Sequence, residues 1–268
     1  MTRFAEVVGD PIAQSLSPVI HGFWLEALGM AAEYRREQVD RAGFSSWLDR
    51  RRGDPDWLGA NVTMPLKLDA LSAADELSDR AVAAGAANLL KLQDGKLYAA
   101  NTDVGAVAAL VARLKDGGAP ADRVTILGNG GAARAALVGL RFAGVHDIVI
   151  QARDMAAARA LAVEFQTGHA PQPLTARIEG DGLINCTPLG MEGEDCLNCE
   201  LGGLNPEGWV FDMVTGETPL LTEAARRGLK LVRGIDMLVE QAATSFEIFF
   251  GAQPPRDRDG ELMLLLRP

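Results

Sequence analysis

The chain of 268 residues contains 26 basic and 36 acidic side chains, which gives a formal net charge of −10, and 48% of its residues are hydrophobic. At this length we expect two domains, since single cores rarely grow beyond about 250 residues, and the negative charge argues against nucleic acid or an anionic membrane as a partner. The sequence has no run of about 18 apolar residues and residues 1–6 lack the apolar segment of a signal peptide, so we expect a cytoplasmic protein.

The first part of the chain is predicted to form a strand at 4–9, a turn-rich loop at 10–18 and a helix at 19–28. Ser17 is a natural N-cap for this helix, whereas Ser15 has no such structural role, and two hydroxyls in one loop indicate a polar ligand. His21 lies off the expected buried face and is predicted to be at the helix surface or in a hydrogen bond. That face is expected to carry Ile20, Phe23, Trp24 and Leu28.

The next predicted elements are a strand at 34–39, a helix at 44–51 and a buried strand at 57–63. This last strand ends in the polar side chains Asn61 and Thr63, and another helix begins within residues 64–67. Lys67 therefore lies in a first helical turn, where the positive end of the helix dipole disfavours an ammonium charge, a useful property in a proton donor. Most lysines are solvated surface residues, but the position beside Asn61 and Thr63 favours a functional role for Lys67.

A hairpin is predicted from strands at 84–92 and 96–101, joined at the strong turn signal Asp94–Gly95. Asn88 lies at the start of the first strand. Thr102 and Asp103 are then predicted to cap a helix at 104–114, a sufficient structural explanation for Asp103. Residues 115–120 contain two glycines and a proline and are predicted to link this helix to a nucleotide-binding domain.

Residues 124–138 form an apolar strand that passes through a glycine turn into an alanine-rich helix. In this G-x-G-x-x-A pattern Gly128 permits the tight turn, Gly130 lets the backbone approach a pyrophosphate, and Ala133 lets the helix pack closely on the strand. The N–H groups of the first helical turn then face the phosphates. A second apolar strand at 147–151 ends about 20 residues after the glycines, where a ribose-binding side chain is expected.

The end of that second strand carries Arg153 and Asp154, which indicate different cofactors. Arg153 can pair with the 2′-phosphate of NADP. Asp154 can cap the next helix, predicted at 155–165, or hydrogen-bond the free 2′-hydroxyl of NAD. The alternation of strands and helices predicts a parallel sheet that is covered on both faces.

The remaining elements are strands at 182–191 and 208–214, a helix at 218–227, a strand at 230–232 and a helix at 237–250. Gln241 is a polar residue within an apolar helical segment, and its simplest interpretation is an amide that faces solvent. Residues 261–266 are expected to pack back on the first domain.

The sequence contains three cysteines, Cys186, Cys196 and Cys199. They are too few and too clustered for a disulfide framework. Cys196 and Cys199 form an isolated C-x-x-C, but a zinc ion would need two more ligands and a redox pair would normally open a helix. We interpret them as loop thiols and expect no metal site.

Taken together, these motifs resemble the shikimate dehydrogenases along nearly the whole chain. The matching segments follow the order of that family: Ser-Leu-Ser-Pro at 15–18, Asn-Val-Thr-x-Pro-x-Lys at 61–67, Asn-Thr-Asp at 101–103, Gly-x-Gly-Gly-Ala-x-Arg-Ala at 128–135, Ile-Asn-x-Thr-Pro-Leu-Gly-Met at 184–191 and Met-Leu-Val-x-Gln-Ala at 237–242. The resemblance implies an α/β substrate-binding domain at 1–102 with 236–268, and a Rossmann-type dinucleotide-binding domain with a parallel sheet at 103–235.

The resemblance also implies a reaction, the reversible transfer of a hydride between NADPH and the ketone of 3-dehydroshikimate in aromatic amino-acid biosynthesis. Lys67 and Asp103 would be the catalytic pair, with Lys67 protonating the carbonyl oxygen and Asp103 orienting substrate and lysine. Ser15 and Ser17 would bind the substrate carboxylate. The ring hydroxyls would be held by Asn61, Thr63, Asn88 and Gln241. NADP would be bound by Gly128, Asn129, Gly130, Gly131, Ala132, Arg153, Asp154, Thr187, Met213, Gly234 and Met237.

The chain departs from the family pattern in several places. Gln14 replaces a histidine, Leu89 follows Asn88 in place of a threonine, and the cofactor loop reads Ala-Arg-Asp at 152–154 instead of Asn-Arg-Thr. After Asp212 the family's Tyr-x-Pro segment is replaced by the shorter run 214–218. A quinate or quinate/shikimate dehydrogenase, the use of NAD, and a non-catalytic nucleotide-binding regulator therefore remain as alternatives, with a monomer or a homodimer as the expected assembly.

Overall fold

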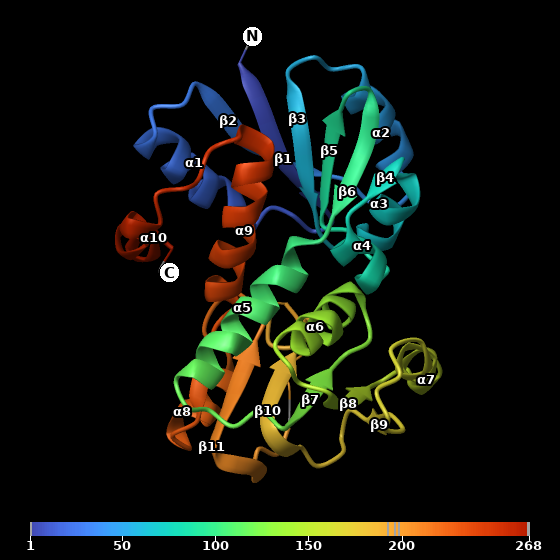
Figure 1. Ribbon diagram of the computed structural model, residues 1–268, viewed down its shortest axis with the longest axis vertical. Helices are drawn as coiled ribbons and strands as arrows, with labels where there is room; N and C mark the ends of the chain where they lie inside the picture. The colour runs from blue at the N-terminus through green and yellow to red at the C-terminus, as the bar shows by residue number, and fades with distance from the viewer. Residues whose placement is uncertain (1, 192, 196, 198, 267–268) are drawn as a thin grey trace. The chain divides into compact units, whose positions relative to one another are not determined.

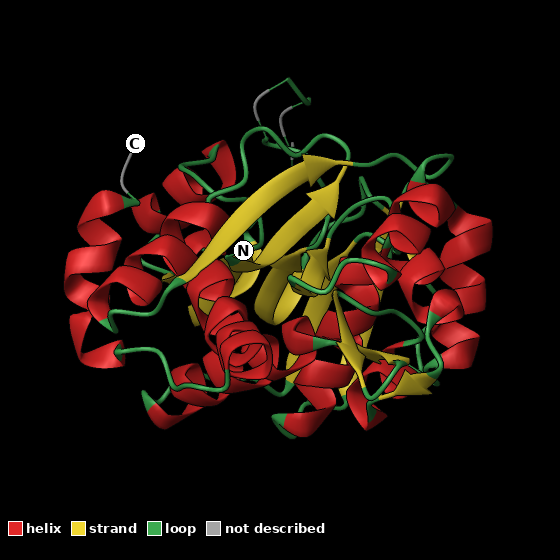
Figure 2. Ribbon diagram, turned by 90° about the horizontal axis from the view of Figure 1, so that it is seen from above, coloured by secondary structure: helices red, strands yellow, loops and turns green. Residues whose placement is uncertain are grey.

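The computed structural model describes residues 2–191, 193–195, 197 and 199–266. The chain divides into two compact units, unit 1 with residues 1–102 and 239–268, and unit 2 with residues 103–238. Each unit contains a six-stranded sheet, and the strands run between helices in Figure 2. The mixed α/β class predicted from the sequence is confirmed. Among the described residues, no helix has both the length and the apolar composition that crossing a membrane requires.

The sheet of unit 1 has the strand order β2-β1-β3-β5-β6-β4. Its strands are β1 (Arg3–Gly9), β2 (Ala32–Gln38), β3 (Trp57–Val62), β4 (Glu76–Leu77), β5 (Leu89–Gln93) and β6 (Lys96–Ala100). β1 pairs in parallel with β2 and β3, while β5 is antiparallel to both β3 and β6. The carboxyl ends of β1, β2 and β3 therefore meet at one edge of the sheet.

Helices cover both faces of this sheet. They are α1 (Ser17–Ala27), α2 (Phe44–Arg52), α3 (Lys67–Ala73), α4 (Asp79–Ala84), the later part of α9 (Gly234–Phe250), the short 3-10 helix η1 (Arg256–Arg258) and α10 (Asp259–Leu265). Figure 1 shows α1 and α9 on one face and α2, α3 and α4 on the other. As predicted, the C-terminal segment packs on unit 1, where α10 contacts α1.

Strand β3 presents alternate residues to these two faces. Ala60 and Val62 join the apolar core that contains Trp47 of α2. Gly59 faces α9, because a Cβ added at Gly59 would lie only 2.7 Å from the ring of Phe249. Since residues two apart share a face of a strand, Asn61 points to the side of α9 as well.

Two predicted helix starts are wrong. Ser17 is the first residue of α1 and not its N-cap, because Leu16 already has a helical conformation and makes no side-chain cap bond. Ser15 accepts a hydrogen bond from the backbone N–H of Ser17 at 3.4 Å. At the other end Leu28 lies beyond the helix and is 39% exposed, not buried, and Phe23 is only partly buried.

The predicted start of α5 is also wrong, because the helix covers Thr102–Asp116 and so includes both Thr102 and Asp103. The first N–H group of this helix is capped from a distance, since the Asn88 Oδ1 accepts the Thr102 N–H at 2.7 Å. α5 also continues to Asp116, so the predicted linker at 115–120 lies inside unit 2 and the chain crosses between units at 102/103.

The hairpin turn is confirmed, with positive φ angles of 51° at Asp94 and 78° at Gly95. Its first strand is shorter than predicted, however. Ser78 caps α4 by accepting the Ala81 N–H, and Gly85 ends the helix in the left-handed conformation. Residues 79–84 are therefore helical, and the strand begins at Leu89.

Unit 2 contains the parallel sheet predicted for dinucleotide binding, with the order β12-β11-β10-β7-β8-β9. Its strands are β7 (Arg123–Leu127), β8 (Asp147–Ala152), β9 (Gln172–Pro173), β10 (Glu179–Asn185), β11 (Gly203–Asp212) and β12 (Lys230–Val232). Numbered within the unit, this order is 3-2-1-4-5-6, which is typical of Rossmann folds. From β7 the next strands are added on one side of the sheet, and from β10 they are added on the other side. Ligands are expected at this switch point, at the carboxyl ends of β7 and β10.

The helices of unit 2 are α5, α6 (Gly131–Phe142), α7 (Met155–Glu164), α8 (Pro219–Arg226) and the start of α9. α6 packs tightly against α5, because a Cβ added at Gly139 would lie 2.7 Å from the Cβ of Val107. Only glycine allows this approach.

Candidate active site

The loops that carry the predicted substrate residues start side by side at the carboxyl edge of β1 and β3. The backbone N–H of Thr63 donates to Val8 O and that of Asp10 donates to Met64 O, both at 2.9 Å. A Cβ at Gly9 would lie 2.4 Å from Thr63 Cγ2, so glycine is required for this approach. The loop that leads to Ser15 and Ser17 therefore begins beside the segment from Thr63 to Lys67.

Asn61, Asn88 and Gln241 belong to one buried network of hydrogen bonds, together with Thr102 and Ser245. The Thr102 hydroxyl accepts from Asn88 Nδ2 at 2.9 Å and lies 3.2 Å from Gln241 Oε1. The Ser245 hydroxyl accepts from Asn61 Nδ2 at 2.8 Å and donates to the Gln241 carbonyl at 3.0 Å. The prediction that Gln241 faces solvent is wrong, since it is 8% exposed and packs inside unit 1.

Ser245 and Tyr34 are members of this network that no sequence motif identifies, and Thr102, predicted only as a helix cap, belongs to it as well. Ser245 lies four residues after Gln241 on α9, so both side chains are on one helix face. This spacing of four residues is the sequence feature that indicates a shared role for Gln241 and Ser245. Tyr34 donates its phenolic O–H to Asn61 Oδ1 at 2.7 Å, and no sequence pattern links these two residues.

Lys67 and Asp103 are each joined to this network through the backbone. Lys67 is the first residue of α3, and its carbonyl accepts the N–H of Ala87 at 2.9 Å, directly before Asn88. Asp103 follows Thr102 in the chain and is the second residue of α5. The backbone positions of both residues are thus fixed next to members of the network.

His21 lies in the core of unit 1, which contradicts both predicted environments. It is completely buried and stacks on the Tyr34 ring, with centroids 3.9 Å apart and planes 1° apart. Neither ring nitrogen has a hydrogen-bond partner among the described residues. The physical reason is α9, whose Phe246 covers this second face of α1. Burial lowers the pKa of His21 to about 3, so the ring is neutral.

The glycine turn after β7 leaves its backbone open to a ligand. Gly128 has a φ of +104°, and a Cβ there would lie 3.2 Å from Thr187 Cγ2, so the protein itself requires glycine at this position. Gly130 has an ordinary φ of −87°, and a Cβ there would meet nothing within 4 Å. Glycine at 130 is therefore explained by space for a group outside the chain, and the bare N–H groups that start α6 fit a pyrophosphate. Ala133, in the first turn of α6, is fully buried, which agrees with the close packing predicted for it.

The turn after β8 shows which role Asp154 has in the folded protein. Its Oδ1 accepts the N–H groups of Ala156 and Ala157, both at 3.0 Å, so Asp154 is the N-cap of α7. Its backbone carbonyl accepts from Asn129 Nδ2 at 3.3 Å, which ties this turn to the glycine turn. Arg153 is exposed beside it.

At the end of β10 and β11, a buried carboxylate organises the chain. Asp212 accepts hydrogen bonds from Asn185 Nδ2, the Val214 N–H and the Thr218 hydroxyl at 2.9, 3.1 and 2.7 Å. Burial raises the pKa of Asp212, and these donors oppose the rise. Asn185 also holds Thr187, whose hydroxyl donates to Asn185 Oδ1 at 2.7 Å.

Two other predicted cofactor residues lie at the start of α9. Gly234 has a packing reason to be glycine, since a Cβ there would lie 2.3 Å from the Val214 carbonyl oxygen and 2.7 Å from that of Met213. Met237 is 8% exposed.

Two of the three cysteines lie in the described part of the chain. Cys186 and Cys199 are partly buried, and burial raises the pKa of the Cys199 thiol to about 11. Cys196 lies outside the described residues. Within the described part of the chain, no group of three or more His, Cys, Asp or Glu side chains is placed to hold a metal ion.

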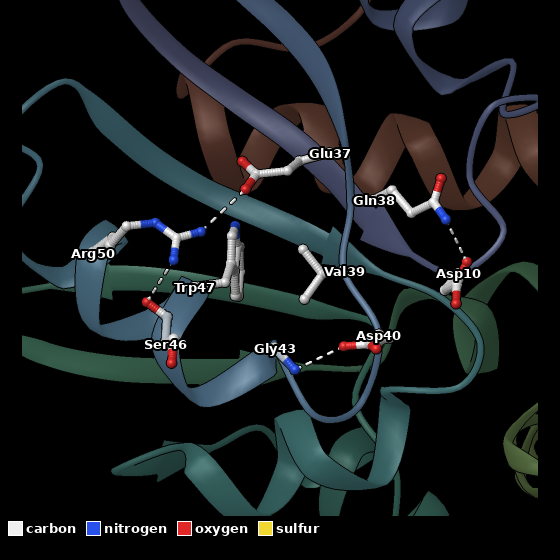
Figure 3. Close-up of a pocket in the computed structure, with 9 residues that line it drawn as sticks. All are labelled: Asp10, Glu37, Gln38, Val39, Asp40, Gly43, Ser46, Trp47 and Arg50. Carbon is white, nitrogen blue, oxygen red and sulfur yellow. Dashed lines mark hydrogen bonds and ion pairs between the residues drawn. The ribbon is translucent and has the colours of Figure 1, made fainter.

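A pocket of about 460 Å³ opens on the α2 side of unit 1 (Figure 3). It is lined by Asp10, Glu37, Gln38, Val39, Asp40, Gly43, Ser46, Trp47 and Arg50. Its polar groups bond to one another, as in the pairs Gln38–Asp10 at 2.8 Å and Arg50–Glu37 at 3.3 Å. None of the predicted substrate residues lines this pocket, and Asn61 points to the opposite face of the sheet.

Comparison with known proteins agrees with this arrangement. Residues 7–90 match the shikimate dehydrogenase substrate binding domain, and residues 234–258 match the shikimate 5′-dehydrogenase C-terminal domain. A relative from Sphingopyxis alaskensis named shikimate dehydrogenase (NADP(+)) is 43% identical over 267 residues, which cover 98% of this chain and 96% of the relative. The chain belongs to the shikimate dehydrogenase family.

Solved structures of the family show the same architecture. The shikimate 5-dehydrogenase of Thermus thermophilus, in complex with NADP(H) and shikimate, is 35% identical with a TM-score of 0.85, covering 99% of this chain and 100% of that one. A ligand-free 5-ketofructose reductase of Gluconobacter is 27% identical with a TM-score of 0.84, covering 99% of each chain. The architecture is therefore shared with a reductase named for a different ketone.

The buried His21 predicts how stability depends on pH. The unfolded chain binds a proton at His21 below a pKa of about 6.5, whereas the folded protein does not until about pH 3. The contribution of His21 to the free energy of unfolding is therefore fully present above pH 6.5 and falls by about 1.4 kcal/mol per pH unit as the pH decreases toward 3. Urea unfolding between pH 7.5 and 4 will show a shallower loss for His21→Phe than for the wild type. His146→Gln, at an exposed histidine, is the control, and equal slopes for all three proteins contradict the prediction.

Replacement by alanine is expected to have opposite effects at the two glycines of the turn. Gly128→Ala will lower the unfolding temperature, because alanine is strained at a φ of +104°. Gly130→Ala will keep the free energy of unfolding within about 1 kcal/mol and raise the KM for NADP by more than about tenfold, because its methyl group occupies the phosphate position. Calorimetry and initial-rate kinetics test this pair, and an unchanged KM in Gly130→Ala removes the turn from the cofactor site.

Proposed function

We propose that this protein is a shikimate dehydrogenase, which reversibly reduces 3-dehydroshikimate to shikimate with NADPH. The observation that carries the proposal is the shared network of Asn61, Asn88 and Gln241, whose polar side chains suit a hydroxylated ring, with Lys67 and Asp103 attached to it along the backbone. The name of the Sphingopyxis relative and the ligands of the Thermus structure support the same substrate and cofactor.

In this proposal unit 1 binds the substrate and unit 2 binds the dinucleotide. Ser15 and Ser17 bind the carboxylate. Ring hydroxyls are held by Asn61, Thr63, Asn88 and Gln241. NADP is bound by Gly128, Asn129, Gly130, Gly131, Ala132, Arg153, Asp154, Thr187, Met213, Gly234 and Met237. As an enzyme of biosynthesis the protein is proposed to act in the cytoplasm, as a monomer or a homodimer.

Lys67 and Asp103 are proposed as the catalytic pair. The nicotinamide, when bound, supplies the hydride that adds to the carbonyl carbon. Negative charge then grows on the carbonyl oxygen, where the Lys67 ammonium stabilises it and donates the proton that completes the alcohol. Asp103 accepts hydrogen bonds that keep the lysine and the substrate in line. In the reverse direction the neutral amine of Lys67 accepts the proton of the alcohol and becomes the ammonium again.

Two cofactor-loop residues favour NADP in this proposal. Arg153 is exposed and available to a 2′-phosphate, while the Asp154 Oδ1 already accepts two N–H groups of α7. Asp154 therefore has a structural role that does not require it to bind a ribose hydroxyl. Its negative charge still opposes a phosphate nearby.

One different candidate is a quinate or quinate/shikimate dehydrogenase, which the altered segment after Asp212 favours. That segment has no tyrosine, and the Asp212 carboxylate accepts hydrogen bonds from the Val214 N–H and the Thr218 hydroxyl of the same segment. A non-catalytic nucleotide-binding regulator is the third possibility, but Lys67 and Asp103 are both present, which argues against it.

A panel of two substrates and two cofactors separates these functions. We expect rapid oxidation of shikimate with NADP, followed at the nicotinamide absorbance, with slower rates for quinate and for NAD. Lys67→Ala will lower kcat by at least about 100-fold with a smaller change in KM, because the interaction is strongest in the transition state. Lys96→Ala, at an exposed lysine paired with Glu76, is the matched control. Faster turnover of quinate selects the paralogue, and no turnover in any combination selects the regulator.

Arg153 and Asp154 give a second, independent test of the cofactor. Arg153→Ala will raise the KM for NADP by about tenfold and leave that for NAD nearly unchanged, because a charge-assisted phosphate contact is lost. Asp154→Asn will lower the KM for NADP by about two- to five-fold, the effect of one exposed charge. Its unfolding temperature will stay the same, since Asn and Asp are equal N-caps, whereas Asp154→Ala will lose about 1 kcal/mol. Parallel changes for NAD and NADP contradict both roles.

A further inference from the structure

The orientation of the Asn61 amide is fixed by its neighbours within unit 1. Tyr34 Oη lies 2.7 Å from Asn61 Oδ1, and Asn61 Nδ2 lies 3.3 Å from the Asn88 carbonyl and 2.8 Å from Ser245 Oγ. A backbone carbonyl can only accept a hydrogen bond, so the nitrogen of the amide must face Asn88. The oxygen must then face the phenol of Tyr34.

This orientation limits what Asn61 can offer a ligand. Both hydrogens of Nδ2 are donated inside the protein, to Asn88 and to Ser245, and one lone pair of Oδ1 is taken by Tyr34. The second lone pair of Oδ1 is the remaining position. Asn61 is 6% exposed, and because only this acceptor position is left, a ligand that bonds to its amide must do so as a hydrogen-bond donor.

Tyr34 is held so that its O–H always points to Asn61. Its ring is buried, stacks on the neutral ring of His21 at 3.9 Å, and has Phe249 on a further side. Burial, with a smaller effect from the nearby Glu6 carboxylate, raises the pKa of Tyr34 well above its usual value. The phenol therefore keeps its proton and stays a hydrogen-bond donor to Asn61 Oδ1 over the working pH range of an enzyme.

We propose that Tyr34 is a positioning residue that presents Asn61 to the substrate purely as an acceptor, so that this position recognises a ring hydroxyl and rejects a ligand without a donor there. The hydroxyl must be one that stays a hydroxyl in both oxidation states, because the ketone of the oxidised substrate has no hydrogen to donate. The inference rests on the proposed function for the identity of the substrate. The orientation of the amide does not depend on it.

The first experiment compares Tyr34→Phe, Asn61→Ala and the double variant with the wild type. Tyr34→Phe will raise the KM for shikimate about five- to tenfold and change kcat less than about twofold, because the amide is no longer held toward the hydroxyl. In the Asn61→Ala background Tyr34→Phe will have no further effect on KM. Tyr98→Phe, at the other tyrosine of the chain, is the matched control and will behave as the wild type.

Substrate analogues show whether the loss belongs to one hydroxyl. Among shikimate analogues that each lack one of the hydroxyls that are not oxidised, one will show equal KM values for the wild type and Tyr34→Phe, and any other will show the full increase. A uniform increase for every analogue, or the same increase in the Asn61→Ala background, indicates general loosening and overturns the proposal.

A spectroscopic readout separates this inference from the proposed function. In protein labelled with ¹⁵N at asparagine, the side-chain amide signal of Asn61 is identified by its loss in Asn61→Ala. We expect it to shift in Tyr34→Phe and to stay in place in Tyr98→Phe. An unmoved signal overturns the positioning role whatever the substrate is. A wild type inactive on shikimate overturns the proposed function, while a shifted signal still supports the role of Tyr34.

Discussion

The structure of unit 1 depends on the hydrogen bonds between Asn88 and Thr102. The Asn88 side chain accepts the first N–H of α5 and donates to the Thr102 hydroxyl, which in turn lies against Gln241 of α9. Buried amides are costly unless every donor and acceptor is paired. Pairing them here requires Asn88, Thr102 and Gln241 of unit 1 to meet at one place, so the same bonds that stabilise the fold also gather the side chains proposed to bind substrate.

The proposed site of unit 2 differs from that of unit 1, because the dinucleotide would be bound mainly by backbone groups. Gly128 is needed for the turn itself, whereas Gly130 leaves space that the protein does not use. Asp154 caps α7 and Asn129 holds the Asp154 carbonyl, so the two turns at this edge support each other. These bonded turns differ from the exposed Arg153, the residue proposed to select the cofactor.

Features set by neighbouring residues could be predicted from the sequence, and features set by distant contacts could not. The glycine turn, the Asp94–Gly95 hairpin and the alternation in unit 2 depend on a few consecutive residues, and all three are confirmed. The sequence predicts His21 at the helix surface or in a hydrogen bond and Gln241 facing solvent, because no local pattern indicates that α1 and α9 pack against each other. The bond from Asn61 to Ser245 spans 184 residues, and no local pattern indicates a pairing over that distance.

The segment after Asp212 bears on which part of the chain recognises the ring in the proposed function. Asp212 closes its own turn through the Val214 N–H and the Thr218 hydroxyl, and residues 213–217 contain no aromatic side chain. In the proposed function, recognition of the ring then rests on the amide network of unit 1. An acceptor that is fixed by Tyr34 discriminates more sharply than a mobile amide, because an unmatched ligand leaves it unpaired in a buried place. In the proposed function, a rigid network of this kind would recognise the ring without an aromatic side chain after Asp212.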